Sequence, residues 1–182
     1  DYQNAAFAAR RSPDTVAGRR ASLEILSRLP AYELPNHLFH NNGDLTFTDR
    51  AAAWGLDQPS LSYGAAYADL DNDGALDLVV NNIDAPAFVY RNRARDAGGE
   101  AGTHHYLQVR LEASAPHRGV GAKVAMTAGG RTQHVFLAPH RGYMSSVDNR
   151  AHFGLGAASR VDSLAITWPD GRRQVLRNVP VD

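Results

Sequence analysis

Residues 69–77 read Asp-Leu-Asp-Asn-Asp-Gly-Ala-Leu-Asp, and this run restricts the possible folds more than any other part of the sequence. Aspartates stand at positions 1, 3, 5 and 9 of the run, and a glycine at position 6 permits a sharp turn. In such a loop alternate residues point inward as the chain wraps around an ion, which is the arrangement of a calcium-binding loop. The spacing therefore predicts a metal loop, with a solvated acidic turn as the alternative.

The predicted ligands are aspartate side chains and one backbone carbonyl, namely those of Asp69, Asp71, Asp73, Asp77 and Ala75. Ca²⁺ prefers such oxygen ligands, Mg²⁺ and Mn²⁺ are weaker alternatives, and Zn²⁺ favours nitrogen and sulfur. Position 12 is Val80, so the bidentate glutamate of an EF-hand is absent and Asp77 is expected to close the site. A saturated Ca²⁺ is a poor activator of water, and the ion is therefore predicted to be structural.

Short strand-like runs flank the loop and continue along the chain. Residues 62–68 and 76–81 lie on either side of it, and 38–48 form a predicted hairpin around an Asn-Asn-Gly-Asp turn. A short run lies at 88–90, and further runs, each bounded by turn residues, lie at 106–112, 122–127, 132–137, 151–154, 163–168 and 174–179. Strands of this length without helices between them predict a mainly β protein.

One helix is predicted ahead of these strands. Ser12 can cap it, Pro13 suits its first turn, Val16 and Leu23 recur at helical spacing, and Pro30 ends it. The predicted organisation is an N-terminal segment with this helix over 1–30, a β-propeller-type repeat over 31–95, a linker over 96–103 and a β domain over 104–182. The last of these is expected to be an antiparallel β-sandwich.

Composition excludes several classes of function. The chain has no cysteine, which removes disulfide scaffolds, thiolate metal sites and cysteine nucleophiles. Its 19 Lys and Arg balance 19 Asp and Glu, so binding to nucleic acid or to an anionic membrane through net positive charge is not expected. Residues 1–84 nevertheless carry 6 basic against 12 acidic side chains, whereas 85–182 carry 13 against 7. No run is apolar enough to predict a membrane span.

Candidates for catalysis and ligand binding are few. The histidines are scattered without a metalloprotease motif, and no serine lies in a nucleophile elbow. Arg141 and Tyr143 are candidate ligand-binding residues, because an arginine and an aromatic ring can stack on a sugar or on a partner protein. A protein without catalytic activity is therefore expected.

The first half of the chain resembles an FG-GAP or VCBS repeat, the blade unit of integrin-α-like β-propellers. The resemblance is carried by residues 36–49, by Trp54-Gly55-Leu56, and by residues 64–82 around the acidic run. It implies that the loop binds Ca²⁺ through the aspartates and the carbonyl named above. Because a propeller needs several blades, it also implies that upstream blades or a neighbouring chain complete the fold.

The second half resembles the ASPIC/UnbV domain. The resemblance is carried by residues 106–111, 119–124, 128–130, 141–143, 152–156, 161–164 and 168–171. A repeat of this kind followed by such a domain is the order found in cartilage acidic protein-like bacterial secreted proteins. The resemblance therefore implies a bacterial protein that is secreted to the extracellular space or the cell surface, and it supplies no catalytic residues.

These observations together predict a calcium-stabilised extracellular module for binding, adhesion or scaffolding. Its expected partner is an extracellular protein, a glycan or copies of itself. Two alternatives stay open at this point. The chain could be the structural protomer of a surface fibre or assembly, or an accessory module of a secreted carbohydrate-active protein.

Overall fold

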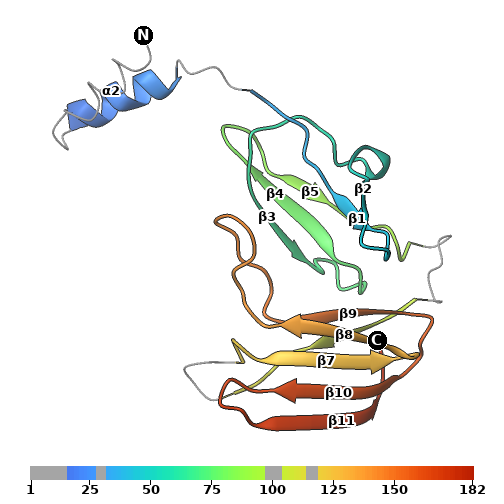
Figure 1. The fold of residues 1–182 in the computed structure, drawn as a ribbon. Helices are drawn as coiled ribbons and strands as arrows, with labels where there is room; N and C mark the ends of the chain where they lie inside the picture. The colour runs from blue at the N-terminus through green and yellow to red at the C-terminus, as the bar shows by residue number, and fades with distance from the viewer. Residues whose placement is uncertain (1–15, 28–31, 97–103, 114–118) are drawn as a thin grey trace. The chain divides into compact units, whose positions relative to one another are not determined.

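A computed structural model describes residues 16–27, 32–96, 104–113 and 119–182. The protein is mainly β, as predicted, with antiparallel strand pairs and one α-helix among the described residues (Figure 1). The chain divides into two compact units, Asp1–Leu61 and Ser62–Asp182, and the boundary falls within the repeat predicted over 31–95. Apart from Asp96, the predicted linker over 96–103 lies outside the described residues, so the predicted domain limits stay a prediction.

The first unit contains one helix and one hairpin. Helix α2 spans Val16–Ser27, and its predicted start at Ser12 lies outside the described residues. Strands β1 (Phe39–Asn41) and β2 (Phe47–Asp49) pair antiparallel around the predicted turn, where Gly43 has a φ of 85°. A 3-10 turn, η1 (Ala52–Trp54), follows. Most of the large apolar side chains described in this first unit are exposed, among them Val16, Leu23, Phe39, Phe47 and Trp54.

The second unit begins with a three-stranded sheet in the order β3-β4-β5. Its strands span Ser62–Ala68, Asp77–Asn82 and Phe88–Tyr90, close to the predicted limits. Ala68 faces Asp77 in the register of β3 and β4. The acidic run is therefore the connection of an antiparallel hairpin, and both of its ends are fixed by strand pairing.

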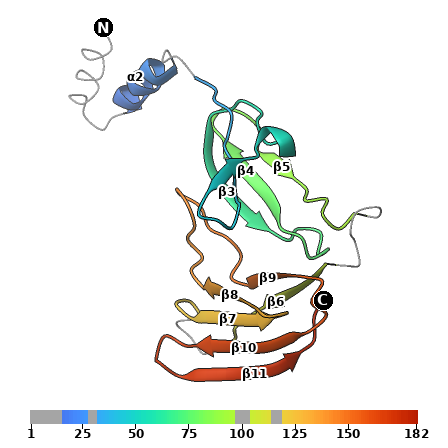
Figure 2. The ribbon, with the colours of Figure 1, turned by 45° about the vertical axis from the view of Figure 1, so that its right-hand side comes forward.

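The remaining strands of this unit form a four-stranded sheet, in the order β11-β10-β7-β8, and a two-stranded sheet of β6 and β9 (Figure 2). Strands β6 to β11 span His105–Val109, Lys123–Ala128, Arg131–Phe136, Ala151–Gly156, Val161–Thr167 and Arg173–Val179. Each lies within a few residues of a predicted run. All pairs in both sheets are antiparallel.

These two sheets share one hydrophobic core. Side chains alternate in β7, so that Val124 and Met126 are buried, and Phe153 of β9 and Ile166 of β10 meet them there. Leu107 of β6 packs against the same cluster. Burial of a side chain of this size contributes about 1.5–3 kcal/mol relative to exposure. The C-terminal strands therefore hold the main core of the described chain.

The described residues show neither a membrane-spanning helix nor a closed propeller. No helix there is long and apolar enough to cross a bilayer. The described strands form sheets of two to four strands and do not close into a propeller. The propeller character of the repeat thus stays an expectation from the resemblance.

Candidate metal centre

The acidic loop joins β3 to β4, and its own side chains hold it in shape. Asp71 Oδ1 accepts a hydrogen bond from the Asp73 amide at 3.3 Å, and Asp73 Oδ1 accepts one from the Ala75 amide at 2.7 Å. Asp69 Oδ2 accepts a third from the Gly74 amide at 3.1 Å. Gly74 has a φ of 89°, a conformation that strongly favours glycine. Each of these bonds turns an aspartate back towards the loop.

The resulting bend gathers three carboxylates. One oxygen from each of Asp69, Asp71 and Asp73 lies within 4.8 Å of the others. At an effective dielectric constant near 20, two unit charges at this separation repel by about 3 kcal/mol, and by less where solvent screens them. The sequence prediction that these three side chains converge is therefore met, and the cluster carries a charge that a cation would relieve.

Asp69 provides the clearest sign of a missing partner. The residue is only 6% exposed, and its Oδ1 atom is buried without any hydrogen-bond partner among the described residues. A buried charged acceptor left unsatisfied is costly, and a divalent cation would satisfy it. Because the donor set is made of carboxylate oxygens, these residues fit a hard cation such as Ca²⁺.

Asp77 occupies a different place. It is buried, its Oδ2 accepts a hydrogen bond from the Leu70 amide at 3.0 Å, and its Oδ1 accepts one from the Asn92 amide at 2.7 Å. Asp77 is not part of the three-carboxylate group and ties the base of the loop to the segment after β5. The predicted ligand roles of Asp77 and of the Ala75 carbonyl stay predictions.

Arg91 lies at the outer edge of the cluster. Its Nε donates to Asp71 Oδ2 at 2.8 Å, and its Nη2 lies 3.7 Å from Asp73 Oδ2 and 3.0 Å from Asp96 Oδ1. The hydrogen bond with Asp71, followed by the charge of Asp96, raises the pKa of Arg91. Arg91 is not among the site residues that the sequence predicts. Leu78 at the start of β4 pairs with Tyr90 at the end of β5, which places residue 91 beside the loop. The short strand-like run after Pro86 is therefore the sequence feature that could have indicated Arg91.

The C-terminal strands also reach the loop. Gln108 Nε2 in β6 donates to Asp69 Oδ2 at 2.7 Å, and Gln108 Oε1 accepts from Arg150 Nη1 at 2.7 Å. Arg150 in turn pairs with Asp148 through its Nε and its backbone amide. No local sequence signal identifies Gln108, because 39 residues separate it from its partner.

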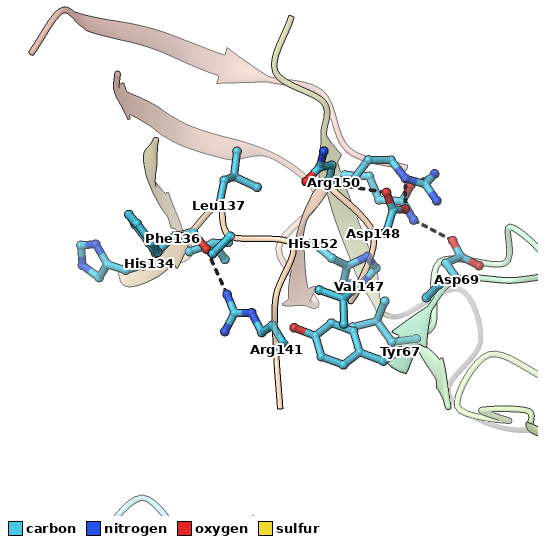
Figure 3. A pocket seen from close by; sticks show the side chains of 16 residues that line it. Tyr67, Asp69, His134, Phe136, Leu137, Arg141, Val147, Asp148, Arg150 and His152 are labelled. Atoms are coloured by element: carbon cyan, nitrogen blue, oxygen red, sulfur yellow. Dashed lines mark hydrogen bonds and ion pairs between the residues drawn. The ribbon is translucent and has the colours of Figure 1, made fainter. Parts of the chain in front are cut away.

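A cavity of about 480 Å³ adjoins Asp69 (Figure 3). Its polar lining includes Asp148, Arg150, His152 and the predicted ligand-binding residue Arg141. The Nδ1 atom of His152 is buried and has no described partner, and burial lowers the pKa of this histidine against the opposing charge of Asp69.

The two predicted ligand-binding residues therefore have separate surroundings. Arg141 lines the cavity and donates to the Phe136 carbonyl at 3.0 Å. Tyr143 does not line the cavity, and its ring packs edge-on against Tyr63 with centroids 5.3 Å apart. The two residues thus make different contacts, and their role in ligand binding stays a prediction.

Two family models match separate parts of the chain. The model for the FG-GAP-like repeat matches residues 22–80, and the model for ASPIC and UnbV matches residues 112–182. The first match ends within β4 and includes the whole acidic loop. The second includes β7 to β11, which contribute most of the core.

Curated relatives show similarity over part of their length. Cartilage acidic protein 1 of Homo sapiens is 47% identical over 57 residues, which are 31% of this chain and 9% of the human protein. The protein of the same name from Xenopus tropicalis is 30% identical over 113 residues, 60% of this chain and 16% of the relative. This chain thus spans less than a fifth of the length of these relatives. One part of this chain is thus similar to an FG-GAP-like repeat and another to ASPIC and UnbV, and part of it is similar to cartilage acidic protein 1.

Proposed function

We propose that this chain is a calcium-stabilised module that works outside the cell in binding or scaffolding and has no catalytic role. The main support is Asp69, whose buried Oδ1 lacks a partner within a group of three carboxylates. The match to an FG-GAP-like repeat supports a propeller-type calcium loop, and the name of the relatives refers to cartilage, a tissue rich in extracellular matrix.

The residues of the loop have distinct roles in this proposal. Asp69, Asp71 and Asp73 would hold the ion, and Asp77 with the Ala75 carbonyl would complete its oxygen shell. Bound Ca²⁺ would supply the positive charge that offsets their repulsion. Arg91 holds one oxygen of Asp71 from outside, which orients that carboxylate and reduces the repulsion in the cluster.

The non-catalytic part of the proposal rests on the side-chain surroundings. Ser146 Oγ lies 3.5 Å from His140 Nδ1, and both residues are exposed. A nucleophile and its base are typically about 2.6–3.2 Å apart, with a third group that orients the base. Among the described contacts of His140 no carboxylate plays that part.

The double substitution Asp71→Ala with Asp73→Ala tests the calcium site. At a free Ca²⁺ concentration 100 times Kd, the ion should stabilise the wild-type protein by about 2.7 kcal/mol. For a chain of this size that corresponds to a rise in Tm of roughly 5–10 °C. Differential scanning calorimetry in Ca²⁺ and in EGTA should show this rise in wild type and its loss in the double variant.

Asp162→Ala is the matched control, because Asp162 is an exposed aspartate on β10 outside the loop. This variant should keep the full calcium-dependent rise in Tm. A wild-type Tm that is the same in Ca²⁺ and in EGTA would refute the proposed site.

A further inference from the structure

Gln108 fixes the orientation of the Asp69 carboxylate from a strand far along the chain. Its Nε2 donates to Oδ2 at 2.7 Å, while Oδ1 of the same carboxylate is the buried atom without a partner. With the Gly74 amide also donating to Oδ2, that oxygen has two donors. Oδ1 is therefore left as the oxygen available to a cation.

Gln108 is itself held in place. Its Oε1 accepts from Arg150 Nη1 at 2.7 Å, which defines which end of the amide faces Asp69. Arg150 pairs with Asp148, and Asp69, Asp148 and Arg150 lie together at the cavity wall (Figure 3). The row from Asp69 through Gln108 and Arg150 to Asp148 is thus a continuous series of charged and polar contacts.

A second residue of β6 covers the loop. The ring of Tyr106 lies so close to Gly74 that a Cβ added there would be 2.3 Å from Cδ1. The Tyr106 amide donates to Asp182 Oδ1 at 3.1 Å, and its ring is stacked with that of His152. Strand β6 therefore contacts the loop at two separate points.

We propose that Gln108 is a positioning residue of the metal loop, through which the calcium affinity of the repeat depends on the C-terminal β strands. This inference rests on the proposed calcium site and adds a dependence that the loop sequence does not contain. Hydrogen-bond partners of metal ligands typically change metal affinity by about 10–100-fold when they are removed. Gln108 is such a partner, supplied by a different part of the fold.

Gln108→Met tests this role because methionine keeps the length of the side chain and removes both hydrogen bonds. Isothermal titration of the full chain with Ca²⁺ should show a Kd at least about 10-fold weaker than that of wild type. Gln133→Met is the matched control. Gln133 lies on β8 and donates to the Gly154 carbonyl at 2.6 Å, outside the contacts of the loop, so its Kd should equal that of wild type.

Urea unfolding in EGTA separates positioning from a general loss of stability. A variant that is less stable in EGTA but binds Ca²⁺ with the wild-type Kd would overturn the inference. If Gln108→Met does not fold, Gln108→Asn replaces it, because the shorter amide cannot reach Asp69 and Arg150 together. Failure of the wild-type chain to bind Ca²⁺ would instead refute the proposed function itself, so the two failures are distinguishable.

Discussion

The two oxygens of Asp69 have contrasting surroundings. Oδ2 accepts from the Gly74 amide and from Gln108, whereas Oδ1 is buried without a partner. An unsatisfied buried acceptor costs about 1–3 kcal/mol, and more when it is charged. Of the three clustered aspartates, Asp69 is the only one classed as buried, so it has the most to gain from a cation.

His152 is expected to make stability depend on pH. Burial lowers its pKa below the ordinary value of 6.5, although the charge of Asp69 opposes this. As the pH falls through 6.5, the unfolded chain gains a proton that the folded protein does not, so the free energy of unfolding decreases. Above that pH the histidine is neutral in both states and has no effect. His152→Gln should therefore reduce the loss of stability between about pH 7 and pH 5.

Urea unfolding at a series of pH values, with Ca²⁺ in constant excess, measures this effect. His134→Gln is the control, because His134 lines the same cavity but its side chain is exposed. That variant should lose stability on acidification as wild type does. An equally steep loss in His152→Gln would contradict the assignment.

The hairpin of β3 and β4 depends on Gly74 for two reasons. Its φ of 89° is unfavourable for other residues, and an added Cβ would meet the Tyr106 ring at 2.3 Å. Gly171, in the turn between β10 and β11, has a φ of 86° but no atom within 4 Å of an added Cβ. The two glycines therefore share the backbone strain and differ in the contact with β6.

Gly74→Ala should destabilise the protein more than Gly171→Ala does. The excess should be about 1–3 kcal/mol, the usual cost of overpacking a buried contact. Unfolding in EGTA measures both losses without a contribution from metal binding. In a Tyr106→Ala background the excess should shrink, because the clashing ring is gone. Equal losses from the two alanine substitutions would show that Tyr106 does not press on the loop.

Elements set by local pattern could be predicted from the sequence. Strand β3 spans Ser62–Ala68, the limits predicted for it, and the regular spacing of Asp69, Asp71 and Asp73 brings their oxygens together. Contacts set by the tertiary fold could not be predicted. Gln108 lies beside the loop because β6 pairs with β9. The loop sequence contains no information about such pairing between distant segments, so this contact could not be predicted from it.

Asp77 likewise combines a feature that the local sequence predicts with contacts that depend on the tertiary fold. Its spacing predicts a ligand, and that role stays a prediction; the structure adds a backbone donor to each of its oxygens, from Leu70 and Asn92, which the spacing does not indicate. The donor at Asn92 exists because β5 pairs with β4, which the short run at 88–90 indicated only as a strand. The spacing of the aspartates can therefore locate a metal loop, but it does not predict the hydrogen bonds that each carboxylate makes.

At the scale of the whole molecule, the net charge of zero conceals an acidic first part and a basic second part. Residues 1–84 carry 12 acidic side chains, and three of these are the clustered aspartates of the loop. One Ca²⁺ would raise the charge of the chain to about +2 and would remove charge where it is most concentrated. The effect of calcium should accordingly be local to one chain.

A calcium-stabilised module and a fibre whose copies are joined by calcium differ in whether one chain supplies all the ligands of the ion. The clustered oxygens come from Asp69, Asp71 and Asp73 of one loop, and their supports Arg91 and Gln108 belong to the same chain. Removing the ion should lower Tm without breaking a contact between copies. Multi-angle light scattering should therefore give the same mass in Ca²⁺ and in EGTA, and the Asp71→Ala, Asp73→Ala variant should match it in both buffers. A mass that falls on chelation in wild type, while the variant stays at the lower mass, would favour the fibre, since the ion would then bridge chains.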